Sequence, residues 1–101
     1  MEPTLTVESD GRLTWTLNGQ LHREDGPAVI WPDGTQEWWV SGKWHRENGP
    51  AVICPDGYQA WFLNGQLHRE DGPARIWSDG TQEWFLNGKP YDPSSKNSAR
   101  T

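Results

Sequence analysis

Three groups of residues in this chain carry side chains that could do chemistry. His, Arg and Glu occur together at 22–24, 45–47 and 68–70, each group followed by Asp or Asn, Gly, Pro and Ala. Imidazole and carboxylate groups are common ligands of zinc. A histidine beside a carboxylate can also act as a general base whose partner holds it in place. The motif therefore suggests metal binding or acid–base catalysis as candidate activities.

The 23-residue interval between these groups argues against both activities. If each interval holds two strands, neighbouring histidines lie about 9–10 Å apart. His22, His45 and His68 could then not share one zinc ion, whose ligands sit about 2.0–2.2 Å from the metal. Each histidine would need its own carboxylates, such as Glu24 or Asp25, and no Ser or Cys recurs at a matching position as a nucleophile. We therefore expect no catalytic residue, no metal site, no cofactor and no enzymatic activity.

A structural role explains the motif better. The stretch Glu24-Asp25-Gly26-Pro27 has the composition of a turn in which carboxylates accept backbone N–H groups. Arg23 could pair with Glu47 or with Asp25, and a repeated pairing would form a ladder that fixes the register between units. We therefore predict a structural role for the recurring arginines, Arg23, Arg46 and Arg69. The alternative is that the His–Arg edge is itself a ligand-binding stripe.

The elements that position these motifs follow from an internal repeat. Four units begin at an Asp-Gly pair and succeed one another every 23 residues without insertion. Their bounds are 10–32, 33–55, 56–78 and, for a partial unit, 79–93. The fourth unit departs from the pattern after Lys89, as terminal units often do. We predict one repeat domain over residues 1–93 and a flexible C-terminal tail over residues 94–101.

Alternation and turn signals predict β-structure. Leu13, Trp15 and Leu17 alternate with threonines, which is the period of a strand. Asn18-Gly19 and its later counterparts are two-residue hairpin signals, and Pro-Asp-Gly at 32–34 and 55–57 is a second turn. Each unit should supply about two strands, near 12–17 and 28–31 in the first, with residues 20–27 either a bulged continuation or a separate loop. The predicted fold class is all-β: a single elongated antiparallel sheet of tandem hairpins with about 7–9 strands.

Side chains alternate across a strand, so parity assigns them to two faces. The constant face hardly varies between units, and we expect it to be buried, with its four tryptophans as the structural core. It holds Trp15, Trp38, Trp61, Trp84, Leu17, Val40, Leu63, Leu86, Ala28, Ala51, Ala74, Ile30, Ile53 and Ile76. The variable face differs between units, and its mixture of aromatic and charged groups indicates a contact surface. It holds Thr16, Trp39, Phe62, Phe85, Val29, Val52, Arg75, Trp31, Cys54, Trp77, Glu37 and Glu83.

Composition and charge narrow the classes of partner. The chain has a net charge of −5 and no basic stripe, so we expect neither nucleic acid nor an anionic membrane as a ligand. Its one cysteine, Cys54, takes a slot filled by Trp31 and Trp77 in other units and is interpreted as a packing substitute. The N-terminal residues lack the pattern of a signal peptide. Together with the single cysteine, which favours a reducing compartment, this predicts a cytoplasmic protein.

The period, the turns and the aromatic residues together resemble MORN-type repeats. Those repeats are 23-residue β-hairpin units stacked into an elongated sheet, and the resemblance covers residues 10–89. The shared elements are the spacing, the NGQ or SGK turn followed by His22 or His45, and the later Asp-Gly turn. The family's Tyr-x-Gly-x-Trp opening is absent, and HRE(D/N)GPA replaces a short His-Gly-x-Gly, so the chain looks like a divergent MORN-like variant. Repeats worded LHREDGPA also look similar to those in phage, giant-virus and bacterial proteins.

The resemblance implies a non-catalytic scaffold or binding module. We expect a module that binds another protein, and a homodimer is one of the assemblies considered. The expected contact residues lie on the variable face: Trp31, Trp39, Phe62, Arg75, Trp77 and Phe85. The phage-like wording extends this hypothesis to a phage-encoded inhibitor of a host factor, such as a defence system, in the host cytoplasm. One alternative is a binder of choline, carbohydrate or nucleotide that uses aromatic cages, as a weaker resemblance to cell-wall-binding repeats suggests. The other is a structural homo-oligomer.

Overall fold

The computed structural model describes residues 2–93, and all fifteen of their regular elements are strands. The tail predicted over residues 94–101 lies outside the described residues. Nine strands form the main sheet: β1 (Thr4–Val7), β2 (Leu13–Leu17), β3 (Gln20–Leu21), β4 (Val29–Ile30), β5 (Gln36–Glu37), β8 (Val52–Ile53), β9 (Gln59–Ala60), β12 (Arg75–Ile76) and β13 (Gln82–Glu83). Six strands pair as three small hairpins: β6 (Trp39–Val40) with β7 (Lys43–Trp44), β10 (Phe62–Leu63) with β11 (Gln66–Leu67), and β14 (Phe85–Leu86) with β15 (Lys89–Pro90).

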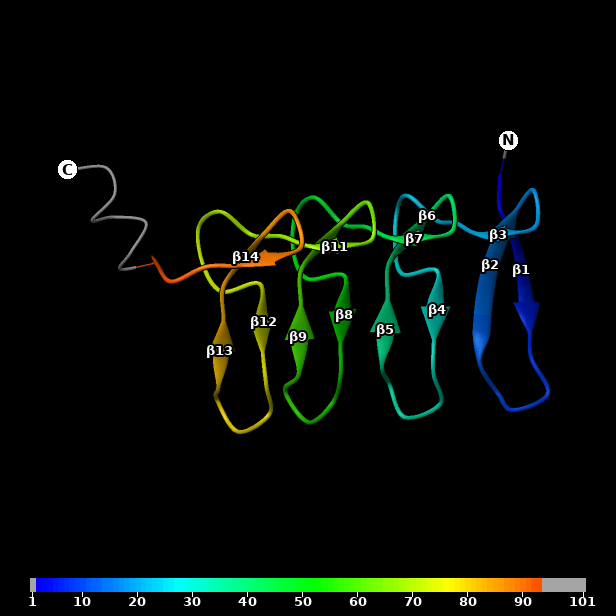
Figure 1. The fold of residues 1–101 in the computed structure, drawn as a ribbon. Helices are drawn as coiled ribbons and strands as arrows, with labels where there is room; N and C mark the ends of the chain where they lie inside the picture. The colour runs from blue at the N-terminus through cyan, green and yellow to red at the C-terminus, as the bar shows by residue number, and fades with distance from the viewer. Residues whose placement is uncertain (1, 94–101) are drawn as a thin grey trace.

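The main sheet grows by one hairpin at a time along the chain. Its strand order is β1-β2-β4-β5-β8-β9-β12-β13, with β3 paired to β2 off this path. Figure 1 shows the four large hairpins side by side in chain order, with the small hairpins along one edge. The molecule measures 52 × 30 × 17 Å, a thickness that suits one sheet with its side chains. The predicted all-β fold with an elongated antiparallel sheet of tandem hairpins is confirmed.

The small hairpins turn where the sequence predicts. Asn18 and Gly19, which join β2 to β3, have φ of 54° and 77°, and a type I′ turn needs positive φ at both positions. Asparagine and glycine adopt this conformation at the least steric cost, which explains the recurring pair. Later units repeat the geometry at Asn64 and Asn87, and Ser41 is forced into it with a φ of 51°.

The large hairpins use a longer turn. Gly34 N–H donates to Trp31 O (2.9 Å), and Gly34 then takes a φ of 96°. This is a three-residue loop that ends in a left-handed glycine. Asp33 Oδ1 accepts the Thr35 N–H (2.8 Å) and holds the loop closed. That bond lowers the pKa of Asp33, because the donated N–H favours the ionised carboxylate.

β1 belongs to the same lattice although its sequence does not repeat. In the β1–β2 hairpin Thr6 lies opposite Thr14, and Val7 lies opposite Leu13. Adding 23 to each number reproduces the pairs of the β4–β5 hairpin. β1 is therefore the structural counterpart of β4, β8 and β12, and the sheet begins with half a unit.

The units 33–55 and 56–78 each contain four short strands rather than the two or so predicted, and the partial unit 79–93 contains three in its described residues. The chain leaves the main sheet at Trp38, forms the β6–β7 hairpin, and returns to the sheet through a loop. Residues 20–27 were predicted to be either a bulged continuation of the second strand or a separate loop. In the structure Gln20 and Leu21 form β3, which pairs with β2, and the remaining residues form a separate loop. Two backbone bonds join this segment to the next unit, from Arg23 N–H to Trp39 O (3.0 Å) and from Gly42 N–H to Leu21 O (2.9 Å).

Small residues form the buried core. Ala28, Ala51, Ala60 and Ala74 have no exposed surface, and Val29 is 2% exposed. No aromatic or leucine-sized side chain of residues 2–93 is fully buried. The prediction of a buried constant face therefore holds for its alanines. It is wrong for its four indoles, which are half-buried: Trp15, Trp38, Trp61 and Trp84. They stay partly exposed because a single sheet has no second layer to cover them.

Candidate functional site

Arginines of the same unit cover the recurring indole rings of the constant face. The guanidinium carbon lies 3.9, 3.8 and 4.0 Å from the ring centroid in the pairs Arg23–Trp15, Arg46–Trp38 and Arg69–Trp61. At this distance the cation is attracted by the negative face of the ring. The stack replaces the missing second layer and occupies the ring faces that a ligand cation would need.

The arginine also explains the residues that follow it. Arg23 Nη1 donates to Pro27 O (3.1 Å), and Arg23 Nε donates to Asp25 Oδ1 (3.2 Å). A Cβ on Gly26 would lie 2.9 Å from Arg23 Cζ, so glycine leaves room for the guanidinium. All of these contacts lie within one unit. Of the two partners predicted for Arg23 the structure has Asp25, not Glu47. Within residues 2–93 the recurring arginines Arg23, Arg46 and Arg69 form no ladder of ion pairs between units.

Histidine makes the side-chain contact that recurs at every step between units. Ser41 N–H donates to His22 Nδ1 (2.9 Å), and the same bond joins Asn64 to His45 and Asn87 to His68. His22 Nε2 lies 3.1 Å from Glu24 Oε2. Since Nδ1 accepts, Nε2 carries the proton and donates to the carboxylate. Both ring nitrogens are thus engaged in structural bonds. In the part of the chain that the structure describes, no three His, Cys, Asp or Glu side chains are grouped to hold a metal.

On the variable face, Glu37 fixes two indole rings. Its Oε2 accepts the Trp31 Nε1–H (2.7 Å), and its Oε1 accepts the Trp39 Nε1–H (2.9 Å). The Arg12 guanidinium lies 4.7 Å from the Trp31 ring centroid. A half-buried indole with a satisfied N–H keeps one orientation. Trp31 and Trp39 are therefore held in place by the chain itself.

An aromatic row continues from Trp39 to the next unit. Trp44 stacks between Trp39 and Phe62, with ring centroids 5.0 and 4.8 Å away. We call Trp31, Glu37, Trp39, Trp44 and Phe62 the first aromatic cluster. Trp44 is not among the contact residues predicted from the sequence, because other units carry leucine or proline at its position. The signal was available in the two-residue turn, which places Trp44 opposite Trp39 in the β6–β7 pair.

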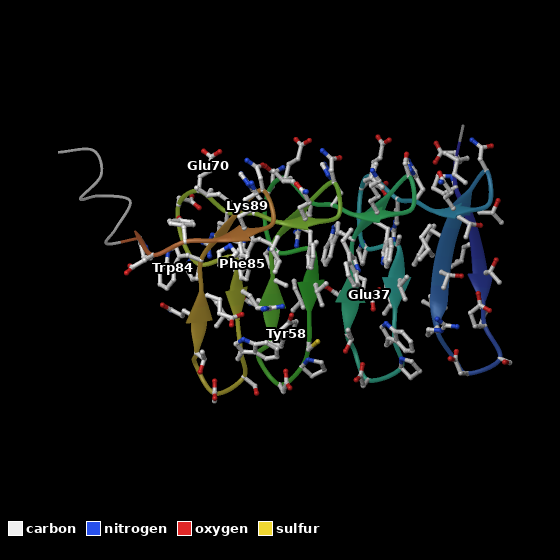
Figure 2. The ribbon with its side chains drawn as sticks, in the orientation of Figure 1. Glu37, Tyr58, Glu70, Trp84, Phe85 and Lys89 are labelled. Carbon is white, nitrogen blue, oxygen red and sulfur yellow. The ribbon has the colours of Figure 1, made fainter. Side chains whose placement is uncertain are left out.

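A second aromatic cluster lies toward the C-terminal end of the sheet. Arg75 Nε and Trp77 Nε1 donate to the same Glu83 Oε1 (2.6 and 3.2 Å), and these bonds lower the pKa of Glu83. The Arg75 guanidinium lies 5.0 and 5.4 Å from the Trp77 and Phe85 rings, and Tyr58 packs on Trp77 (5.0 Å). Figure 2 shows Tyr58 near the turns of the large hairpins and Phe85 beside the small ones. Trp77 is 40% exposed.

The six predicted contact residues thus fall into two groups. Trp31, Trp39 and Phe62 belong to the first aromatic cluster, and Arg75, Trp77 and Phe85 to the second. Cys54, in the slot of Trp31 and Trp77, is half-buried, and burial raises the pKa of its thiol. A thiol with a raised pKa stays protonated at neutral pH and is a poor nucleophile.

The constant face carries shallow grooves between neighbouring loops. The larger groove, of about 830 Å³, is lined by Trp38 and Val40 together with Glu24 and Asp25. Arg46 lies in the same groove and already stacks on the Trp38 ring. An open aromatic cage for a quaternary ammonium needs free ring faces, and this ring has one face taken.

Comparison with models of protein families, with curated proteins and with solved structures found no match to this chain. Residues 2–93 contain no helix long and apolar enough to cross a bilayer. The two aromatic clusters and the open edges of the sheet are the features of the structure that indicate a function.

Proposed function

We propose that the chain is a non-enzymatic protein-binding module and that the variable face is its contact surface. The observation that carries the proposal is the pair of ordered aromatic clusters on a molecule only 17 Å thick. Aromatic residues in a globular domain are ordinarily covered by a second layer. Here Trp77, the most exposed of these rings, keeps 40% of its surface in solvent. Large apolar patches rimmed by polar groups commonly mark protein interfaces.

The order within the clusters supports this proposal. Glu37 and Glu83 hold the indole N–H groups of Trp31, Trp39 and Trp77. Rings that are already fixed lose little rotamer entropy when a partner binds. Tryptophan and arginine are also the residue types that dominate binding energy at interfaces.

The size of the face is adequate for a stable complex. The two longer dimensions of the molecule are 52 and 30 Å, and a standard interface takes about 800 Å² from each partner. One partner could therefore cover both aromatic clusters at once. The clusters differ in composition between units, which suits recognition of an asymmetric protein surface.

The test is the double variant Trp39→Ala, Phe62→Ala, which removes the two outer rings of the aromatic row. We expect it to lose a partner captured from the native host cell and to bind the purified partner at least about 30-fold more weakly, since truncation of a hot-spot ring costs about 2 kcal/mol. Affinity would be measured by isothermal titration calorimetry, with far-UV circular dichroism to confirm the fold.

The matched control is Glu24→Ala, Glu70→Ala, which alters exposed loop residues away from the variable face. Equal loss of binding in this control would contradict the proposal. The rival small-ligand function predicts that tryptophan fluorescence changes on titration with choline, oligosaccharides or nucleotides, whereas a protein binder leaves it unchanged. Membership of the MORN-like repeats, and action as an inhibitor of a host factor, are further proposals that the identity of the captured partner would test.

A further inference from the structure

The two ends of the main sheet are open in the described residues. β1 forms one end and β13 the other, and Figure 1 shows them far apart at opposite ends of the row of hairpins. All four residues of β1 are exposed, and Leu5 and Val7 keep 50% and 68% of their surface in solvent. Ala28, the interior counterpart of Leu5, is completely buried. An exposed edge strand with apolar side chains is a template for pairing with another chain.

The joints between hairpins show how such an edge is filled inside the molecule. At the first joint Leu13 lies opposite Ile30, and Trp15 N–H donates to Ala28 O (2.8 Å). The same pairs recur 23 residues later between β5 and β8, and again between β9 and β12. The joint is formed by backbone bonds. Ile30, Ile53 and Ile76 recur on one of its strands, whereas the residues opposite them are Leu13, Gln36 and Gln59. The joint therefore accepts unlike side chains on one of its two strands.

The ends are complementary because β1 and β13 are two halves of this joint. β1 is the counterpart of β4, β8 and β12, which pair with the preceding large hairpin. β13 is the counterpart of β5 and β9, which pair with the next large hairpin. Within residues 2–93, Trp84 N–H has no acceptor of the kind that serves the other three recurring tryptophans.

We infer that β1 of one copy of this chain pairs with β13 of a second copy, head to tail, in the register of the internal joints. The 23-residue spacing places Val7 opposite the partner's Gln82 and Thr6 opposite the partner's Glu83. It also aims the partner's Trp84 N–H at the Leu5 carbonyl. Such a contact is heterologous, so it leaves one open end on each side and adds further copies in a line.

Charge at the edge itself opposes this contact little. Glu83 is already paired with Arg75 in its own copy, and Glu8, which keeps its negative charge, accepts the Thr14 hydroxyl (2.8 Å). The joint thus brings together carboxylates that have partners, despite the net charge of −5. Residues 94–101 of the same chain are the competing occupant of the β13 edge, and the experiment distinguishes them from a second copy.

The experiment uses proline to close one edge at a time. Glu8 N–H and Trp77 N–H donate across their own hairpins, so the neighbouring Val7 and Gln82 N–H groups point to the open edges. Val7→Pro and Gln82→Pro each remove one outward donor, and an edge strand tolerates proline. We expect the wild type to grow with concentration in multiples of 11.5 kDa by light scattering. Each variant alone should be monomeric, and an equimolar mixture should form a complex of two chains.

A second measurement avoids dependence on proline. In a Cys54→Ser background, Val7→Cys and Gln82→Cys should form a disulfide with each other when the two variants are mixed, because opposite residues of a ladder lie within reach of the bond. A wild type that stays monomeric at all concentrations would overturn the inference, as would Gln82→Pro that still dimerises through two β1 strands. The variant Trp39→Ala, Phe62→Ala should assemble normally, which separates this edge contact from the proposed function of the variable face.

Discussion

Replacement of Gly72 by alanine tests whether the arginine stack holds each unit together. An ideal Cβ at this position would lie 2.7 Å from Arg69 Cζ and 2.9 Å from Nη1. The Arg69 guanidinium would have to shift, which disturbs its stack on the Trp61 ring, 4.0 Å from the guanidinium carbon, and its bond to Pro73 O (3.1 Å). The φ of Gly72 is not left-handed, so the perturbation is steric.

The expected fall in the free energy of unfolding is estimated from the two contacts of Arg69 that the substitution disturbs. The cation–π contact of a partly desolvated arginine is worth about 0.5–2 kcal/mol, and a hydrogen bond from a charged donor about 1.5–3 kcal/mol. Water replaces part of the hydrogen bond, so the free energy of unfolding should fall by about 1.5–3 kcal/mol. For a domain of this size that lowers Tm by roughly 6–20 °C.

The assay is thermal unfolding followed by far-UV circular dichroism. Gly49→Ala is the graded control, since its Cβ would lie 3.2 Å from Arg46 and should cost less. The decisive control is Gly72→Ala in an Arg69→Ala background, where the cost should fall to below about 0.5 kcal/mol because the obstacle is gone. An undiminished cost in that background would show that the glycine serves the backbone, and the stacking argument would be wrong.

Two further predictions concern the turns. Ser41→Asn should stabilise the fold by about 0.5–1 kcal/mol in chemical denaturation, because asparagine accepts the φ of 51° more readily than serine; a loss of stability would contradict this reading of the turn. The pKa values of Asp33 and Asp79 are lowered by backbone N–H groups of Thr35 and Thr81. Their stabilisation is thus complete above the ordinary carboxyl pKa of about 3.9 and is lost as pH falls through the lower native values. Asp33→Ala, Asp79→Ala should therefore lose stability at pH 7 and show a shallower decline between about pH 5 and pH 2, measured by tryptophan fluorescence.

The turns and the sheet could be predicted because they depend on single residues with strong local preferences. Asn18 and Gly19 specify a type I′ hairpin without help from the rest of the chain. Period-two alternation also places Trp31, Glu37 and Trp39 on one face, and one carboxylate of Glu37 does reach both indoles. The alternation does not predict burial, because Val29 of the same face is 2% exposed. A fixed 23-residue interval without insertions predicts the elongated sheet, because it repeats the same joint between hairpins along the chain.

Other features could not be predicted from the sequence, because a repeat period fixes the position of a residue in the sheet and not the orientation of its side chain. Nothing in the spacing shows that Arg23 folds back over Trp15 instead of pairing with the next unit. The place of β1 in the lattice was also hidden, because Thr4 and Leu5 stand where the next hairpin has Pro27 and Ala28. The β-branched shape that Thr6 shares with Val29 is too common to mark a repeat. Similarly, Trp44 occurs in one unit only, so a search for recurring residues passes over it.

The alanine core has a consequence for how the chain can change in length. Because Ala28, Ala51 and Ala74 are buried at joints between neighbouring large hairpins, no side chain has to match one at the far end of the molecule. The free energy of unfolding is then approximately a sum of the stabilities of the individual units and of the contacts between adjacent ones. Whole units can be duplicated or excised without a new core, so such a gene can vary the span of its product in fixed increments.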